Sequence, residues 1–377
     1  MSPRASATLP TVEYDLGIVG GGPAGLGVAI AARLRGLRVA VFDRAEPAID
    51  KACGEGVMPD GAARLARWGV ELDPHESSRF VGIRFLDGAL VAEGRFPAGS
   101  GVSVRRSHLH AALAARAAEL GAELRWGTKV EGVASAGVET ARGLVPCRVV
   151  VGADGLHSRV RRWLGLEGSP AAFRRFGVRR HFACAPWSDC VEVYWADRCE
   201  AYVTGTGPGR VGVALLWSGE TSDFDTLMAR FPALSQRLGD AQIVSRDRGA
   251  GPLHQRVRGV VKGQAALVGD AAGYLDAITG EGLSIAFHEA EALVDAVLAR
   301  DLELYARRQK ALRRLPNAMT QLLLVAERSP RRRRRFLRTV ALHPQLFNRL
   351  LGIHSRQLPP RSVGAAGAWQ LASCLLG

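Results

Sequence analysis

Three short runs of consecutive apolar residues stand out along the chain, and each ends at a segment rich in glycine. They cover residues 16–19, 149–151 and 265–268. Continuous apolar runs of this length are typical of strands buried on both faces of a parallel sheet. The pattern therefore predicts an α/β protein in which three strands deliver their carboxyl ends to glycine turns.

The N-terminal part of the chain has the pattern of a strand, a helix and a second strand. Residues 12–19 form the first predicted strand. Residues 24–35 carry apolar side chains at helical spacing, and Gly36 ends the predicted helix. Residues 38–42 form the second strand. This order predicts the start of a βαβ unit.

The turn inside this unit reads Gly-Gly-Gly-Pro-Ala-Gly at residues 20–25, and Asp43 follows its last glycine by 18 positions. We expect Gly20 to permit a tight turn, Gly22 to let the backbone approach a pyrophosphate, and Gly25 to let the helix pack closely on the strand. Asp43 is a candidate acceptor for ribose hydroxyls, with a turn residue at a strand end as the alternative. The unit therefore predicts a dinucleotide-binding site.

The hydrophobic pattern changes between these segments. Residues 76–104 alternate apolar and polar positions, which favours antiparallel strands. Residues 107–120 form a predicted helix and residues 122–130 another strand. Residues 173–248 are again rich in strand patterns, with a short helix near residues 224–238. We interpret these strands as an inserted sheet that roofs a substrate site.

Composition is typical of a globular chain. Of the 377 residues, 47% are hydrophobic, and no apolar stretch approaches the roughly 18 residues that span a bilayer. We expect a cytoplasmic protein. The six cysteines are scattered without a CxxC pair, so we expect reduced thiols and no metal site.

The charge balance is strongly basic. Lys and Arg total 50 against 36 Asp and Glu, and residues 331–335 are five consecutive arginines. This charge attracts anionic lipid, an acidic partner or nucleic acid. The chain has no zinc-finger spacing and no RNA-binding signature, so nucleic acid is the least favoured partner.

The glycine and acid segments together resemble the flavoprotein monooxygenase superfamily, which includes aromatic hydroxylases, flavin-dependent halogenases and geranylgeranyl reductases. The resemblance covers residues 12–300. Residues 152–161, Gly-Ala-Asp-Gly-Leu-His-Ser-Arg-Val-Arg, are similar to its DG motif, which implies that Asp154 lies at FAD and NAD(P)H contacts. Gly269 and Asp270 are similar to its GD motif, whose aspartate binds ribityl and ribose hydroxyls of FAD.

The resemblance implies further cofactor contacts. The loop at residues 274–282 precedes a predicted helix, residues 283–299, whose N-terminus would face the flavin and stabilise its reduced anion. Arg106 falls where the superfamily places an arginine near FAD; the alternative is a surface position, as for Arg105. The candidate FAD-binding residues are Gly20, Gly22, Gly25, Asp43, Arg44, Arg106, Asp154, Gly269, Asp270, Gly280 and Gly282.

One segment distinguishes branches of the superfamily. Residues 51–59 contain Lys-Ala-Cys-Gly, which is similar to the K-x-C-G segment of geranylgeranyl reductases. Cys53 and Glu55 are the candidate catalytic residues; the alternatives are a small buried hydrophobe and a loop carboxylate held by backbone N–H groups. The reductases' Y-x-W-x-F-P signature is absent near Tyr202, and the halogenase signature W-x-W-x-I-P is absent.

The resemblance implies an α/β fold with an FAD-binding Rossmann-like domain of the glutathione-reductase type. We assign this domain to residues 1–75, 100–172 and 250–315, and the inserted substrate sheet to residues 76–99 and 173–249. Residues 316–377 form a basic helical region. Its apolar positions fit a peripheral helix on the inner face of the membrane or a lid over an apolar pocket. The alternative is a cap on the FAD domain with residues 331–335 in solvent.

The expected function is that of an FAD-dependent monooxygenase. NADPH or NADH would reduce the flavin, and O2 would supply the oxygen that hydroxylates or epoxidises a hydrophobic, aromatic or polyketide-like molecule of secondary metabolism. Trp195, Tyr202 and Trp217 are candidates for an apolar substrate pocket or for ordinary core. The first alternative is a reductase of prenyl double bonds. The second is an electron-transfer flavoprotein that reduces a quinone, against which the lack of an iron–sulfur segment counts.

Overall fold

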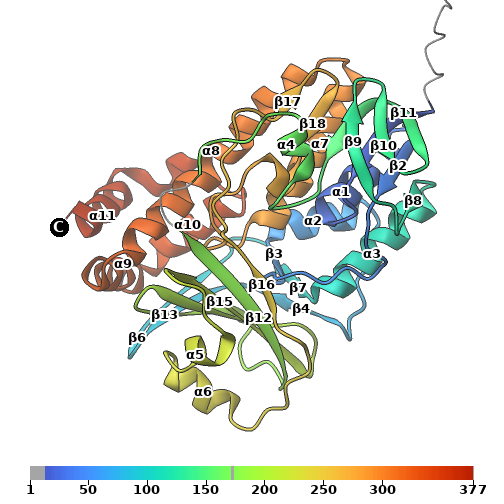
Figure 1. The fold of residues 1–377 in the computed structure, drawn as a ribbon. Coiled ribbons are helices and arrows are strands. Elements are labelled where there is room, and N and C mark those ends of the chain that lie inside the picture. Colours follow the sequence, from blue (N-terminus) through green and yellow to red (C-terminus); the bar gives the residue numbers. More distant parts are fainter. Residues whose placement is uncertain (1–12, 171–173, 377) are drawn as a thin grey trace, which may run out of the picture.

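A mostly parallel sheet forms the upper layer of the computed structural model, which describes residues 13–170 and 174–376 (Figure 1). Its path runs β17-β18-β11-β1-β2-β8, and a hairpin of β9 and β10 extends β11. The strands are β1 Tyr14–Val19, β2 Val39–Phe42, β8 Glu123–Arg125, β9 Val130–Ala134, β10 Gly137–Thr140, β11 Gly143–Gly152, β17 Val261–Lys262 and β18 Ala265–Leu267. The three predicted apolar runs lie side by side in this sheet, as β1, β11 and β18.

The register of these strands brings their carboxyl ends to one level. Val19 pairs with both Phe42 and Gly152, and Gly152 pairs with Leu267. In an open parallel sheet, ligands bind outside the carboxyl ends of the strands, where the strand order reverses. The glycine turns after β1, β11 and β18 therefore meet at one edge of the sheet.

Helices cover the parallel sheet. α1, which follows the first glycine turn, is almost wholly buried and packs against α3 and α7. α8 packs along α7, and its Asp301 N-cap carboxylate accepts the Leu304 N–H. The bounds are α1 Pro23–Arg33, α2 Pro59–Arg67, α3 Arg106–Glu119, α4 Arg159–Trp163, α7 Gly282–Leu298 and α8 Leu302–Glu327.

A seven-stranded sheet forms the lower layer, in the order β16-β12-β15-β14-β13-β5-β6. All of its pairs are antiparallel except β5 with β13. The strands are β5 Gly82–Asp87, β6 Leu90–Arg95, β12 Arg175–Ala183, β13 Cys190–Ala196, β14 Cys199–Gly205, β15 Arg210–Ser218 and β16 Arg248–Ala250. The short helices α5 Phe224–Met228 and α6 Pro232–Leu238 pack on its outer face. They stand where the sequence predicted one helix, because Pro232 begins a new one.

A small third sheet lies between the two layers, in the order β3-β7-β4. Its strands are β3 Gly56–Val57, β4 Ser77–Phe80 and β7 Gly101–Val104. β4 therefore pairs outside the large antiparallel sheet, although β5 and β6, from the same predicted strand-rich stretch, pair within it.

The C-terminal helices close one side of the molecule, at the left of Figure 1. α9 Pro330–Leu342 and α10 Pro344–His354 pack on β6, and α11 Gly364–Leu376 packs on α9. Their apolar side chains, among them Phe336 and Phe347, are buried with Phe85 of the antiparallel sheet. Among the described residues, no helix is long and apolar enough to cross a membrane.

The position of α9 corrects the expectation that residues 331–335 all lie in solvent on the FAD domain. Arg333 is 4% exposed. Its Nε lies 3.0 Å from a carboxylate oxygen of Asp87, and it donates to the Ala196 carbonyl at 3.0 Å. α9 is thus anchored to the antiparallel sheet by the buried Arg333, and the exposed Arg334 adds a longer contact of 3.8 Å to the same Asp87 carboxylate.

We predict that Arg333→Gln destabilises the protein and that Arg332→Gln, at an exposed position of the same run, does not. Removing Arg333 leaves the buried Asp87 charge with only the exposed Arg334 at 3.8 Å, and breaking a buried ion pair in this way costs on the order of 3 kcal/mol. Urea unfolding of both variants measures the difference. Equal unfolding free energies for the two would contradict the anchoring role of Arg333.

Candidate functional site

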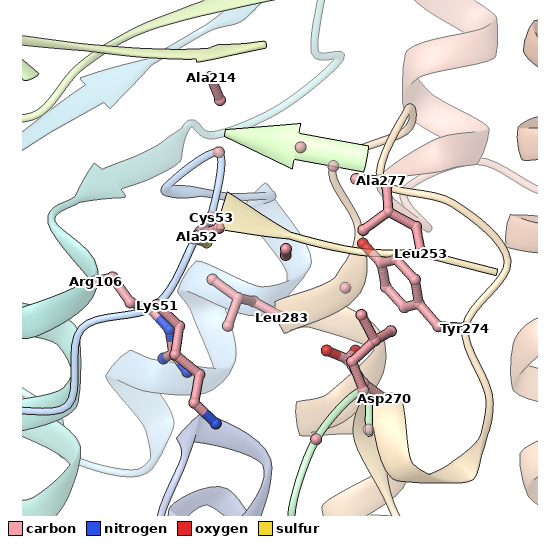
Figure 2. Close-up of a pocket in the computed structure, with 18 of the residues that line it drawn as sticks. Lys51, Ala52, Cys53, Arg106, Ala214, Leu253, Asp270, Tyr274, Ala277 and Leu283 are labelled. Atoms are coloured by element: carbon pink, nitrogen blue, oxygen red, sulfur yellow. The ribbon is translucent and has the colours of Figure 1, made fainter. Parts of the chain in front are cut away.

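A cavity of about 1110 Å³ lies between the carboxyl edge of the parallel sheet, the inner face of the antiparallel sheet and the C-terminal helices. Figure 2 shows Lys51 and Arg106 on one side of it and Asp270 and Tyr274 on the other. One end is lined by the glycine turns and the other by apolar side chains.

The first glycine turn is shaped by two contacts that leave no room for a side chain. Gly20 has φ +109°, and a Cβ there would lie 2.4 Å from the Ala153 carbonyl oxygen. A Cβ on Gly25 would lie 1.9 Å from the Gly20 carbonyl oxygen. Gly22 lines the cavity, at the start of α1, where free backbone N–H groups favour an anion.

Asp43 holds this turn as well as lining the cavity. Its carboxylate accepts the Gly21 N–H at 2.8 Å and the Ala45 N–H at 2.9 Å. His110, which the sequence did not single out, lies with its Nε2 2.9 Å from the Gly21 carbonyl. Burial and the nearby Arg106 lower the pKa of His110, so the neutral ring donates this hydrogen bond. Arg44 lines the cavity beside Asp43.

Arg106 provides the test of whether the site fits FAD. It is 8% exposed, and its Nη1 has no hydrogen-bond partner among the described residues. Its Nη2 lies 3.7 Å from the position of a Cβ on Gly22. A buried guanidinium with a free donor beside a glycine turn fits the pyrophosphate of a dinucleotide. Arg105, the alternative, is half-buried and is not among the residues that line the cavity.

The DG segment is braced by its own aspartate. The Asp154 carboxylate accepts hydrogen bonds from the Ser158 hydroxyl at 2.5 Å and the Arg159 N–H at 2.6 Å, which fixes the start of α4. The buried Arg161 donates to the carbonyls of Leu156 at 2.9 Å and Ala271 at 3.2 Å. Arg161 therefore ties the DG segment to the GD segment.

The GD segment is held by an ion pair that sequence patterns did not indicate. Glu289 of α7 accepts the Gly269 N–H at 2.8 Å, and Arg313 of α8 donates to the Gly269 carbonyl at 2.7 Å. Glu289 and Arg313 pair with each other at 2.6 Å. Asp270 faces the cavity (Figure 2). Burial raises the pKa of Asp270, and Arg313 opposes that rise.

The loop before α7 borders the cavity and is fixed from the antiparallel sheet. Tyr202 of β14 donates its hydroxyl to the Ile278 carbonyl at 2.8 Å. Gly280, Gly282 and Leu283 line the cavity, so the N-terminus of α7 faces it.

A buried charge cluster lies next to this loop. Arg175 of β12 contacts Glu200 of β14 at 2.7 Å, Asp276 of the loop at 2.9 Å and Glu327 of α8 at 3.4 Å. Three carboxylates thus share one guanidinium. Burial raises the pKa of Glu200 to about 7, opposed by Arg175, and burial likewise raises the pKa of Asp276 and Glu327. The cluster joins the antiparallel sheet to the loop before α7 and to α8.

The two candidate catalytic residues have different surroundings. Glu55 has φ +62° and is 3% exposed; it accepts the Arg106 N–H at 2.9 Å and contacts His181 Nε2 at 2.6 Å. The sequence analysis gave, as the alternative to a catalytic role, a loop carboxylate held by backbone N–H groups. Glu55 matches it in part, because it accepts one backbone N–H and also contacts a histidine side chain. Cys53 lines the cavity, and burial raises the pKa of its thiol, so the thiol is protonated at neutral pH.

The apolar end of the cavity is aromatic. Phe85 of β5 stacks on Phe347 of α10 with ring centroids 5.0 Å apart, and both line the cavity. Tyr202 and Trp217 also line it. Trp195 lies in the core, in edge contact with Phe85.

The comparison with protein families identifies the cofactor that this site binds. The model described as "FAD binding domain" matches residues 13–211, which is more than half of the chain. The chain belongs to this FAD-binding domain family. The residues around Arg106 and the glycine turns fit that cofactor, and the protein is an FAD-dependent oxidoreductase by family.

Individual relatives of this flavoprotein come from more than one kind of enzyme. Digeranylgeranylglycerophospholipid reductase of Methanosarcina mazei is 28% identical over 332 residues, 77% of each chain. FAD-dependent monooxygenase OpS4 of Beauveria bassiana is 35% identical over 162 residues, 38% of each chain. The solved flavoprotein/dehydrogenase of Cytophaga hutchinsonii shares the fold, with TM-score 0.81, 14% identity, and coverage of 97% of this chain and 99% of that one.

We predict that Arg106→Gln weakens FAD binding roughly 10- to 100-fold, because a hydrogen bond to a charged group contributes about 1.5–3 kcal/mol. Arg105→Gln is the matched control, since it removes the same charge one position away. Quenching of flavin fluorescence on titration of the apoprotein measures both affinities. A fall in affinity for Arg105→Gln alone would reverse the assignment.

We predict that Glu200→Gln gains stability over the wild type as pH rises. A carboxyl whose pKa is raised from 4.5 to about 7 on folding lowers stability progressively across that window, because the folded state must lose a proton that it binds more tightly than the unfolded state does. A shift of this size corresponds to about 3 kcal/mol.

The measurement is the unfolding free energy of the wild type, Glu200→Gln and the exposed control Glu139→Gln at pH 5 and pH 8. Glu200→Gln is close to the wild type at pH 5, where Glu200 is protonated, and is the more stable protein at pH 8. Parallel pH curves for the wild type and Glu200→Gln would show that Glu200 has an ordinary pKa.

Proposed function

We propose that this flavoprotein is a monooxygenase that uses NADPH or NADH and O2 to hydroxylate or epoxidise a hydrophobic, aromatic or polyketide-like small molecule of secondary metabolism. The observation that carries the proposal is the apolar, aromatic end of the cavity, closed by α9 and α10. An oxygen-transferring flavin site needs this seclusion, because water in the site diverts the reaction.

FAD, reduced by the nicotinamide, supplies the activation of O2 in this reaction. The chain supplies position and electrostatics. The N-terminus of α7 faces the cavity at Gly282, and its partial positive charge stabilises negative charge on a reduced flavin. Phe85 and Phe347 provide flat apolar surfaces on which an aromatic substrate would lie.

Two further points support oxygenation. The relative with the higher local identity, OpS4, is named a monooxygenase. The aromatic signature of the reductases is absent around Tyr202, and the Tyr202 hydroxyl is used to hold the Ile278 carbonyl.

A second candidate, reduction of a prenyl double bond, is favoured by Cys53. Its protonated thiol faces the cavity from the Lys-Ala-Cys-Gly segment, and a relative named a reductase matches 77% of the chain. In that reaction FAD, held by the glycine turns and Arg106, would supply the hydride for one alkene carbon, and the Cys53 thiol would donate a proton to the other.

Product mass with and without O2 separates the two reactions. We predict that the holoenzyme, given NADPH and a panel of aromatic polyketides, quinolones and prenylated lipids, adds one oxygen atom to a substrate, and that this atom carries the label when labelled O2 is supplied. Cys53→Ala retains this activity, because oxygen transfer does not draw a proton from the thiol. A product that gains two hydrogen atoms under anaerobic conditions, and is lost in Cys53→Ala, would replace monooxygenation by the reductase reaction.

A further inference from the structure

The positive charge of the protein is concentrated in its last 50 residues. Residues 328–377 contain ten arginines, no lysine and no acidic residue. The rest of the chain carries 40 basic and 36 acidic residues, so it is close to neutral. A net charge this unevenly placed gives one side of the molecule a strong positive potential.

α9 presents most of this charge to solvent. Arg331, Arg335 and Arg338 follow the spacing of one helical stripe, which continues to Leu342. The three arginines are exposed and have no carboxylate partner among the described residues, and the Leu342 side chain is 77% exposed. The buried face of the same helix, with Phe336, packs toward the cavity.

α11 adds an exposed apolar surface beside this stripe. The helix contains no charged residue, and it packs on α9. Trp369 is 72% exposed, and the exposed positions near it are mostly alanines: Ala365, Ala366, Ala368 and Ala372. Gln370 of α11 contacts His343, the residue after α9, at 3.2 Å. Trp369 and Leu342 precede these two residues in the sequence, so they lie on segments that are in contact. Figure 1 shows α9 and α11 together at one extreme of the molecule.

We propose that α9 and α11 form a docking surface for a bilayer that contains anionic lipid. Arginines at headgroup level and an exposed tryptophan with an uncharged helix are the two components of interfacial binding. The sequence left open whether the apolar positions of this region face a membrane or form a lid over a pocket. Phe336 and Phe347 are buried at the cavity, so the membrane contact uses the opposite side of α9. An extended polyanion would satisfy the arginines but not the exposed apolar face of α11.

The placement relates the membrane to the cavity. Phe336 of α9 and Phe347 and Leu350 of α10 line the cavity from inside. A hydrophobic substrate that partitions into a bilayer would reach the enzyme at the helices that wall its site. The membrane contact itself holds for either reaction discussed above, because it depends on surface residues alone.

Co-sedimentation of the FAD-loaded full chain with vesicles tests the proposal. We expect binding to vesicles of phosphatidylglycerol and phosphatidylcholine, weaker binding at high salt, and little binding to phosphatidylcholine alone. Arg331→Gln, Arg335→Gln and Arg338→Gln combined lower the partition coefficient roughly 100-fold, and Trp369→Ser lowers it roughly tenfold. Melting temperature and flavin content show that each variant is folded.

The matched control removes three exposed arginines outside this surface, by Arg142→Gln, Arg246→Gln and Arg258→Gln. It loses little vesicle binding. Equal losses in the two triple variants would overturn the docking surface, as would binding to a DNA duplex that outcompetes the vesicles and is unchanged in Trp369→Ser. These readouts need no turnover, so their failure leaves the proposed reaction standing.

Discussion

The site depends on one steric constraint, the close approach of three strand ends at one edge of a parallel sheet. Ala153 after β11 touches Gly20 after β1, and Gly25 of α1 sits directly against Gly20. A methyl group at either glycine would separate the segments. Because the strand registers place Val19, Gly152 and Leu267 at the same level, the three turns converge without a long loop. The dinucleotide cradle is therefore a property of the sheet as much as of the turns.

Buried charges from distant elements keep these turns in place. Three arginines bridge segments that are far apart in the chain: Arg161, Arg175 and Arg313. Arg161 is buried and donates to backbone carbonyls, whereas Arg175 and Arg313 pair with the buried acids Glu200 and Glu289. Burying charge is costly unless every group is paired. The Arg175 cluster carries more acid than base, so one of its carboxyls binds a proton easily. Fixing a cofactor loop by charge therefore makes the loop's surroundings sensitive to pH.

The sequence predicted the parts of the site that depend on local turn chemistry. The glycine turns and Asp270 lie where strand ends and spacing placed them, since a turn's conformation is dictated by its own residues. The sequence analysis missed His110 and Arg313, because each acts through a partner far away in the chain. His110 contacts the Gly21 carbonyl and Arg313 pairs with Glu289, and no local pattern indicates either contact. Arg333 was recoverable: it precedes Phe336, Leu337 and Val340 at helical spacing, so it shares their buried face. The five consecutive arginines at residues 331–335 made this helical spacing difficult to recognise.

The cavity of this chain contains the features that either of the two proposed reactions would use. In this chain, either proposed reaction would place FAD at the glycine turns and the N-terminus of α7, next to the apolar side chains that line the other end of the cavity. The two proposed reactions differ in what the substrate receives, which is an oxygen atom from O2 in one and a hydride and a proton in the other. Here Glu55 accepts the Arg106 N–H and contacts His181, whereas Lys51 and Cys53 of the same segment both line the cavity, and the Cys53 thiol is the proton donor that the proposed reductase reaction would use. Under the two proposed reactions, the Cys53 thiol takes part in alkene reduction and not in oxygen transfer, so Cys53 is the position at which the proposals differ, while the fold and the cofactor are the same.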